Sequence, residues 1–272
     1  MTNALHLHIL GSGSKGNCSL VESPEGLIMI DNGFSRRETL ARMHALGLDE
    51  SRVRALVLTH EHGDHTRGIA VWCKRFAGEL YASAGTPAAR RGFEELPFHE
   101  VEPGEDVQIG DVLVETFPTS HDVVNPMGMR FTAGGDAIAF ATDTGVLTPP
   151  ALRLLADARI LALECNHDVT MLRHGGYPRF LQERILSDEG HLSNAQAAEA
   201  VRTLVTTRTE QLIAMHISQE NNRPSLAVRT LAEALGATLD NKIGSAATLE
   251  RPGGAQPLHI RAAGQDRPLT IL

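Results

Sequence analysis

The hydrophobic positions of the chain follow two periods, one typical of strands and the other typical of helices. At the start, Leu5, Leu7 and Ile9 alternate with His6 and His8, and this period of two predicts a half-buried strand. The two histidines then project from the opposite face, which is either solvated or covers the sheet. The same criteria predict further short strands at residues 18–22, 27–31, 53–59, 80–82, 98–118 in several pieces, 127–132, 137–142, 160–163 and 211–215.

Between these strands the pattern changes to the helical period. Ser35 is a suitable N-cap for a helix that continues to residue 46, with Glu38 as its capping-box partner. Because strands and helices interleave, the sequence predicts an α/β fold. We expect one domain over residues 1–245, followed by a hairpin or extended tail over 246–272. Further helices are expected at residues 66–76, 87–94, 149–157, 169–186, 194–206 and 224–235.

Composition narrows the protein class. The 272 residues are 42% hydrophobic and 21% charged, an ordinary globular balance. No apolar run approaches the roughly 18 residues of a membrane span, and no secretory signal is visible, so no membrane partner is expected. The three cysteines, Cys18, Cys73 and Cys165, form no paired motif, which favours a reducing cytoplasm. A net charge of −8 argues against a broad basic nucleic-acid face, but it does not exclude nucleic acid.

Four candidate metal ligands lie within six residues, directly after the apolar strand at 53–59. They are His60, His62, Asp64 and His65, and Gly63 lets the backbone bend between the two pairs. Imidazole and carboxylate are ligands that Zn²⁺ and Mn²⁺ accept. In extended chain, residues two apart project the same way, so the first two histidines can meet one ion and the second pair can face another. The sequence therefore predicts a metal site at this loop.

The spacing HxHxDH resembles the signature of the metallo-β-lactamase superfamily. The resemblance implies a four-layer αββα sandwich and two divalent metal ions, Zn²⁺ or Mn²⁺, with ligands His60, His62 and His121 for one ion, Asp64, His65 and His216 for the other, and Asp143 shared between them. Asp31, at the end of the third strand, either orients a ligand as in that family or forms a turn. The sequence does not decide the metal, because histidine and carboxylate suit several ions.

Two ions about 3.5–4 Å apart can activate a water molecule and polarise the oxygen of a substrate. This chemistry suits phosphodiesters, thioesters, lactones and β-lactams. The motif therefore indicates the mechanism but leaves the substrate open.

Three flanking stretches bear on the substrate. Residues 11–17, GSGSKGN, offer Ser12, Ser14 and Asn17 to an anion, or they form a plain glycine turn. Residues 190–194, GHLSN, place His191 and Ser193 at a helix N-terminus, which attracts phosphate or is only capped. His167, in ECNHD, either protonates a leaving oxygen or lies at the surface of a loop.

Seven stretches in this order, GSGSKGN, THEHGDH, SHD, ATDTG, ECNHD, GHLSN and HISQENN, resemble the YycJ/WalJ-type single-domain exonucleases. That resemblance implies 5′→3′ exonuclease action, on DNA rather than RNA. The candidate catalytic groups are Asp64, His167 and His191. Three alternatives remain open: a tRNase Z-like nuclease, a glyoxalase II-like thioesterase or lactonase, and a non-catalytic metal-dependent module. The oligomeric state is also open.

Overall fold

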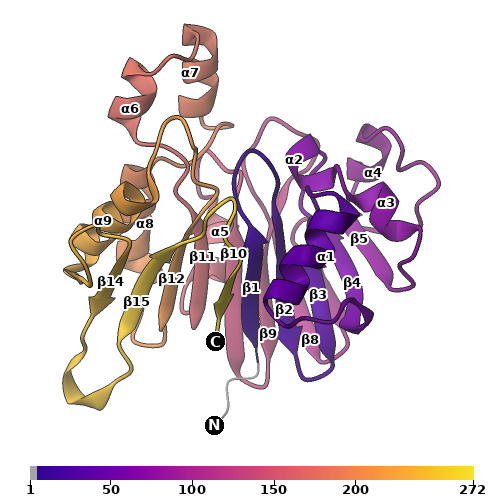
Figure 1. Cartoon of the computed structure of the whole chain (residues 1–272), viewed down its shortest axis with the longest axis horizontal. Coiled ribbons are helices and arrows are strands. Elements are labelled where there is room, and N and C mark those ends of the chain that lie inside the picture. Colours follow the sequence, from indigo (N-terminus) through magenta and orange to yellow (C-terminus); the bar gives the residue numbers. More distant parts are fainter. Residues whose placement is uncertain (1–4) are drawn as a thin grey trace. The chain divides into compact units, whose positions relative to one another are not determined.

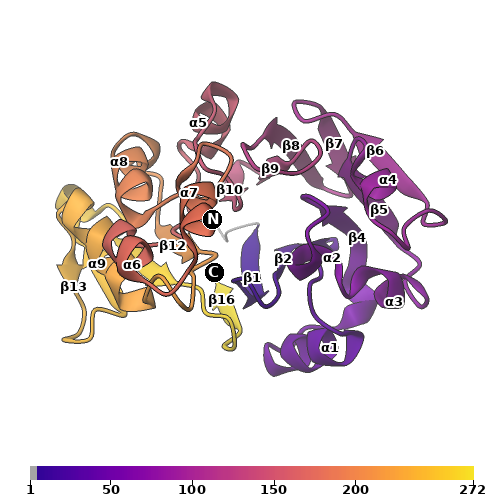
Figure 2. The same ribbon diagram turned by 90° about the horizontal axis from the view of Figure 1, so that it is seen from above.

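The computed structural model describes residues 5–272. It divides into two compact units. The first unit contains residues 5–118, 123–137 and 265–272, and the second contains residues 119–122 and 138–264. Figures 1 and 2 show the course of the chain through both. No helix among the described residues has the length and apolar character that a bilayer span requires.

The first unit is built on a mixed sheet. Strands β3 to β6 run parallel to one another, while β2 is antiparallel to β1 and to β3, and the late strand β16 pairs with β1. Among residues 5–272 this sheet has seven strands: β16 (Leu269–Ile271), β1 (His6–Gly11), β2 (Cys18–Ser23), β3 (Gly26–Ile30), β4 (Val53–Leu58), β5 (Glu79–Ser83) and β6 (Phe98–Val101). The same unit contains the antiparallel strands β7 (Asp106–Ile109), β8 (Val112–Pro118) and β9 (Met127–Ala133).

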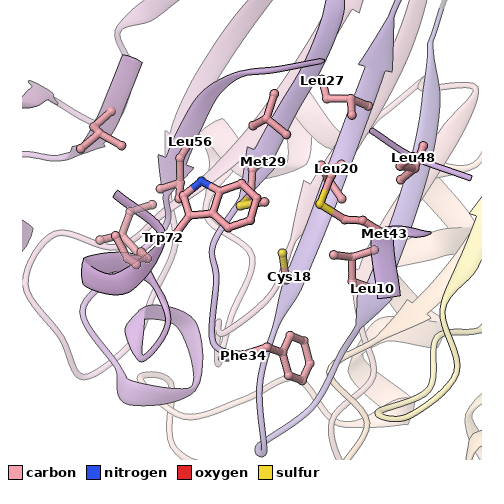
Figure 3. Close-up of a cluster of buried hydrophobic side chains, with 14 of the residues drawn as sticks. Leu10, Cys18, Leu20, Leu27, Met29, Phe34, Met43, Leu48, Leu56 and Trp72 are labelled. Carbon is pink, nitrogen blue, oxygen red and sulfur yellow. The ribbon is translucent and has the colours of Figure 1, made fainter. Parts of the chain in front are cut away.

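One face of this sheet is covered by helices through an aliphatic core. Alternating side chains such as Leu20, Met29 and Leu56 project from neighbouring strands, and Met43 and Trp72 pack on them from the helices (Figure 3). The four helices of this unit are α1 (Arg36–Ala45), α2 (Gly63–Thr66), α3 (Ile69–Cys73) and α4 (Thr86–Ala89), and a short 3₁₀ turn occupies Glu50–Arg52. This core fixes the end of β4, after which the HxHxDH motif follows.

The predicted helices of the first unit are shorter than expected, except for α1. Ser35 caps α1 as predicted, but Glu38 binds Arg42 at 2.8 Å rather than closing a capping box. The single helix predicted over residues 66–76 was wrong. It is replaced by α2 and α3, because the chain turns at Gly68, whose added Cβ would lie 1.8 Å from the carbonyl oxygen of Phe34.

The second unit alternates strands and helices. Its strands β10 (Asp136–Ala141), β11 (Ile160–Glu164), β12 (Gln211–Met215) and β15 (Leu258–Ala262) are successive parallel neighbours. Its longest helices, α8 (Asn194–Leu204) and α9 (Pro224–Leu235), lie side by side, and α9 contacts β12 and β15 (Figures 1 and 2). Both helices bury an alanine- and valine-rich face. Helix α5 (Pro149–Leu155) precedes β11.

The single helix predicted over residues 169–186 was also wrong. The chain forms α6 (Val169–His174) and α7 (Arg179–Leu186), which are separated by Gly175-Gly176-Tyr177-Pro178. Two glycines favour a break, and Pro178 cannot donate the hydrogen bond that a continuous helix needs. The pair lies beyond the ends of β11 and β12 (Figure 1).

Residues 246–272 begin with a hairpin. Strand β14 (Ala246–Leu249) is antiparallel to β15, and the two-residue strand β13 (Thr238–Leu239) pairs with β14. A 3₁₀ turn at Pro252–Gly254 lies between β14 and β15. The division of the structure into compact units does not fall at residue 245, since β15 extends the sheet of the second unit and β16 that of the first.

Candidate functional site

The first unit gathers the HxHxDH motif at the carboxyl ends of β3 and β4. These strands are parallel, so Asp31, which follows β3, and Thr59, which follows β4, lie at the same edge of the sheet. His60 and His65 are buried, and their ring centroids are 4.1 Å apart, while the rings of His60 and His62 are 5.0 Å apart. The predicted convergence of the motif therefore occurs within this unit.

Asp31 fixes the orientation of two of these imidazoles. Its Oδ2 accepts from Nδ1 of His65 at 2.7 Å, and its carboxylate accepts the backbone N–H and the hydroxyl of Thr59 at 2.8 and 2.9 Å. Because the Thr59 hydroxyl donates to Asp31, its oxygen accepts from Nδ1 of His60 at 2.9 Å. Both rings thus carry their hydrogen on Nδ1 and present the Nε2 lone pair, the arrangement that outer-shell carboxylates give to metal-binding histidines.

The loop of residues 11–17 contacts the same motif. The side-chain amide of Asn17 donates to Asp64 Oδ2 at 3.1 Å and lies 3.0 Å from Nε2 of His65. Backbone N–H groups of Gly13, Lys15, Gly16 and Asn17 all donate to acceptors within the unit. The backbone anion cradle considered from sequence therefore has its donors engaged here, and Ser14 and Lys15 form the exposed tip.

Gly33 closes this loop cluster. A Cβ at this position would lie 1.7 Å from the backbone oxygen of Asp64, so only glycine permits the approach. The backbone N–H of Gly33 donates to the oxygen of Asn17 at 2.8 Å, and the N–H of Asn17 donates to the oxygen of Asp64 at 2.8 Å. These backbone hydrogen bonds thus hold together three loops that are distant in sequence.

The second unit gathers another group of candidate ligands. Strands β10, β11 and β12 are parallel, and Asp143, Glu164 and His216 lie at or just beyond their carboxyl ends. All three side chains are at least 97% buried. Oδ1 of Asp143 is 3.6 Å from Nδ1 of His216 and 3.8 Å from Nε2 of His121. Asp143, His216 and His121, predicted from sequence as ligands, are therefore neighbours in this unit.

Glu164 is the centre of this second cluster. Its Oε1 accepts from Nδ1 of His191 at 2.8 Å and from Nδ1 of His216 at 3.0 Å. Its Oε2 accepts backbone N–H groups of Thr144 and Leu192 at 3.0 and 3.1 Å. Burial alone raises the pKa of Glu164, but the charge and hydrogen bond of His191 and the hydrogen bond of His216 outweigh it and lower the pKa to about 2. The side chain is therefore a carboxylate at neutral pH.

Sequence reasoning missed Glu164 as a site residue. Its signal was present. Glu164 ends an apolar strand that lies, in sequence, between the strand before Asp143 and the strand before His216. A glutamate in such an aliphatic setting is buried only when it has polar partners. The partners, however, lie 20 to 52 positions away, so no local motif contains them.

The two histidines among the candidate catalytic groups differ in environment. The side chain of His191 is 19% exposed, whereas His167 is fully buried, and neither of its ring nitrogens has a hydrogen-bond partner. Burial lowers the pKa of His167 to about 4, although Glu164 acts in the opposite direction, so the imidazole is neutral at pH 7. The ring of His191 lies 4.9 Å from that of His121, whose Nδ1 donates to the carbonyl oxygen of Gly190 at 3.0 Å.

Ser193 caps α8 as predicted. Its oxygen accepts the N–H of Gln196, while the Gln196 side chain accepts the N–H and hydroxyl of Ser193 at 2.9 and 2.7 Å, which completes a capping box. The serine is 2% exposed. The hydroxyl proton is therefore committed to Gln196, and the backbone N–H groups of Asn194 and Gln196 also donate within the protein, to the carbonyl oxygen of His167 and to the Ser193 hydroxyl.

Three of the buried site residues share an uncommon backbone conformation. Asp31, Asp143 and His216 have φ values of 56°, 57° and 51°, and they are three of five such non-glycine residues within 5–272. The left-handed region costs energy for residues other than glycine, and such conformations cluster at functional sites.

The donor sets fit divalent metal ions. Four histidines, His60, His65, His121 and His216, have Nδ1 bound to a protein oxygen that accepts a hydrogen, which leaves Nε2 as the ligand atom. Each unit adds a carboxylate, Asp64 in the first and Asp143 in the second. Such histidine and carboxylate ligands suit Zn²⁺ and Mn²⁺.

Comparisons with known proteins agree with this geometry. A family model described as "Beta-lactamase superfamily domain" matches residues 27–217. Exodeoxyribonuclease WalJ of Streptococcus pneumoniae serotype 2 is 35% identical over 246 residues, which cover 86% of this chain and 91% of WalJ. Exodeoxyribonuclease YycJ of Bacillus anthracis is 34% identical over 235 residues, which cover 85% of this chain and 89% of YycJ.

Solved structures confirm the fold that the sequence predicts. The metallo-beta-lactamase fold protein YhfI from Bacillus subtilis superposes with a TM-score of 0.69, covering 99% of this chain and 100% of YhfI, at 13% identity. A diphosphatase from the PhnP family gives a TM-score of 0.64 at 17% identity, covering 98% of this chain and 97% of its own. At these identities the likeness establishes the α/β metallo-β-lactamase fold alone.

Proposed function

The chain belongs to the beta-lactamase superfamily, in the family of the exodeoxyribonucleases WalJ and YycJ, and on this basis we propose that it is a metal-dependent exonuclease that degrades DNA from the 5′ end. The observation that carries the proposal is the set of buried histidines whose Nδ1 atoms are held by Asp31, Thr59 and Glu164. Burying so many polar groups costs free energy, so a fold that uses them to fix the orientation of imidazoles supports a metal site.

We propose that two divalent ions bind to the ligands that the resemblance to the metallo-β-lactamase superfamily implies. In this proposal His60, His62 and His121 bind one ion, Asp64, His65 and His216 bind the other, and Asp143 is shared. Zn²⁺ or Mn²⁺ is the expected metal. The three cysteines form no disulfide within the described residues, which is compatible with a cytoplasmic location.

Bound divalent ions would supply Lewis-acid activation of the attacking water and of the phosphodiester. Asp31 and Glu164 keep the ligand histidines in one tautomer, so no reorientation is needed when the metals bind. Asn17 positions Asp64 from the neighbouring loop.

We assign proton delivery to the leaving oxygen to His191. Glu164 holds its ring through Nδ1, and the side chain is 19% exposed, so a substrate oxygen can approach it. His167, the other candidate, is buried and neutral at pH 7, so we do not assign it this role. For the substrate phosphate we propose the side chains of Ser12, Ser14 and Asn17 together with the stretch that contains His191 and Ser193.

A labelled-strand assay tests the proposal. Metal-free protein reconstituted with Mn²⁺ or Zn²⁺ is expected to shorten a 5′-labelled DNA strand by releasing label at once, and a 3′-labelled strand by forming a ladder. His62→Ala is expected to lose both activity and metal content. Intact DNA with either metal would refute the nuclease assignment, and rapid hydrolysis of S-lactoylglutathione in its place would select a thioesterase.

His191→Gln tests the assignment of the proton donor. The variant is expected to keep its metal content and to cleave an ordinary phosphodiester about 10²–10⁴-fold more slowly. A substrate with a p-nitrophenyl leaving group needs little protonation and should be much less affected. Equal losses on both substrates would remove His191 from this role, and the same pair of measurements on His167→Gln shows whether the buried ring takes it instead.

A further inference from the structure

A third group of metal-ligating side chains lies in the first unit, away from the HxHxDH loop. His6 and His8 are two residues apart on β1 and therefore share one face, and Glu22 lies directly opposite His6 on β2. This face also carries Leu10 and Leu20 of the helix-covered core. His8 is 3% exposed, so of the two alternatives, a solvated side chain or one that covers the sheet, the structure shows the second for this histidine.

This group is at the far end of β1 from the candidate catalytic loop. β1 is parallel to β3, because each is antiparallel to β2, so Gly11 lies at the same edge as Asp31, while His6 begins the strand. Six residues of strand span roughly 17 Å. An ion bound at His6 could therefore not take part in chemistry at the loop.

The spacing of the ligand atoms matches a tetrahedral zinc site. Oε2 of Glu22 is 3.0 Å from Nε2 of His8 and 3.6 Å from Nδ1 of His6, and all three atoms lie within 4.8 Å of one another. Zinc bonds of about 2.0–2.1 Å at tetrahedral angles place two ligand atoms roughly 3.4 Å apart. We propose that His6, His8 and Glu22 form an additional divalent-cation site of the zinc type, with the fourth position open to water.

Thr270 on β16 binds the ring nitrogen of His8 that does not face Glu22. It lies opposite His8, and its Oγ1 is 2.9 Å from Nδ1 of His8. In the metal-free form Nε2–H donates to Glu22, so Nδ1 accepts from the threonine hydroxyl. When a cation takes Nε2, the hydrogen moves to Nδ1, and the same hydroxyl becomes the acceptor. A hydroxyl serves both tautomers because it donates and accepts.

The charges around the site also suit a cation. Burial lowers the pKa of His8 more than Glu22 raises it, so the ring is neutral at pH 7, as coordination requires. Burial raises the pKa of Glu22, but hydrogen bonds from Arg52 and His8 outweigh this effect and lower the pKa below its usual value, so the group is a carboxylate. Arg52 binds Oε1 and leaves Oε2 to the histidines. The guanidinium repels a cation, so zinc is expected to bind here more weakly than at a structural zinc centre.

Zinc counting on the full chain tests the proposal. Metal-free protein is brought to equilibrium by dialysis against Zn²⁺ at a series of free concentrations, and bound zinc is measured per chain. Wild type is expected to retain one equivalent more than His6→Ala or Glu22→Gln, while nuclease activity is unchanged in both variants. His62→Ala, by contrast, should lose metal at the catalytic loop and keep this site. Equal stoichiometry in wild type and both variants would overturn the proposal.

Two further variants separate a cation site from an ordinary hydrogen-bond cluster. Arg52→Gln removes the opposing charge and is expected to tighten zinc binding here about tenfold. Thr270→Val is expected to weaken it about tenfold or more, through loss of the outer-shell hydrogen bond. If zinc affinity is the same in both variants and in wild type, no cation binds here. In crystals soaked with Zn²⁺, anomalous density between the three ligand atoms is expected, and its absence at saturating zinc would refute the site directly.

Discussion

Replacing Glu164 with glutamine tests whether one buried carboxylate organises the second cluster. The wild-type side chain accepts four N–H groups, two from histidines and two from the backbone of Thr144 and Leu192. Glutamine keeps one oxygen, and its NH₂ group then faces two of these donors. If the NH₂ faces His216, the ring must accept through Nδ1 and carry its hydrogen on Nε2, which prevents coordination.

The size of the effect follows from two independent estimates. Leaving two buried donors unsatisfied costs about 1–3 kcal/mol each. A pKa of about 2 in the folded protein, against 4.5 for an unperturbed glutamate, corresponds to about 3 kcal/mol of stabilisation at neutral pH. Both estimates predict that Glu164→Gln lowers the free energy of unfolding by several kcal/mol. We also expect metal affinity to fall about 10–100-fold.

The same substitution predicts a pH dependence with a defined sign. Because folding lowers the pKa of Glu164, its contribution is fully present above the unfolded pKa of about 4.5, and it is lost as the pH falls towards the folded value of about 2. The stability difference between wild type and variant should therefore shrink between pH 4.5 and 2. Urea denaturation of the metal-free proteins at several pH values measures it.

Glu183→Gln is the matched control. Glu183 is 64% exposed and pairs with Arg179 on the surface of α7, so its loss should change stability by less than about 1 kcal/mol. A Glu164→Gln variant that unfolds at the same urea concentration as this control would refute the reasoning. So would a stability difference that stays constant down to pH 2.

The remaining predictions concern the loops that carry the two clusters. Asp31→Asn keeps a residue that tolerates positive φ, but one carboxylate oxygen becomes an NH₂ group, so the side chain can no longer accept from both the Thr59 N–H and Nδ1 of His65. Metal affinity is therefore expected to fall about 10–100-fold by isothermal calorimetry; unchanged affinity would leave Asp31 as a turn-former. Gly33→Ala drives a Cβ into the backbone of the metal loop and should destabilise the chain by more than about 3 kcal/mol, whereas Gly176→Ala, with open space around it, should be nearly neutral; comparable melting temperatures would contradict the assigned close approach. Ser193→Ala should cost about 1 kcal/mol through the lost cap and raise KM for DNA, and an unchanged KM would confine the serine to a structural role.

The fold and the metal motif were predictable because their signals are local. The apolar strand before His60 and the two-residue spacing of the histidines are contained in one short stretch. The N-caps Ser35 and Ser193 depend on neighbours three residues away, and the structure confirms both.

The parts that sequence reasoning missed depend on contacts between distant segments. The helical period over residues 66–76 gave no indication that Gly68 must pass the backbone of Phe34. The role of Glu164 requires knowledge that three parallel strands end at the same edge. The sequence left residues 11–17 as either an anion-binding loop or a plain glycine turn, because an acceptor such as Gln265, which takes the N–H of Lys15, comes from a distant part of the chain.

Strand β16 has a consequence for how the protein tolerates changes at its carboxyl terminus. It pairs with β1 through Leu269, Thr270 and Ile271, and so covers the outer hydrogen-bonding groups of the first strand. A chain cut before Leu269 would present β1 as a bare edge of alternating apolar residues, a template for pairing with other molecules. Self-association of such a truncated protein is the expected failure, so affinity tags and fusions at this end should leave these three residues intact.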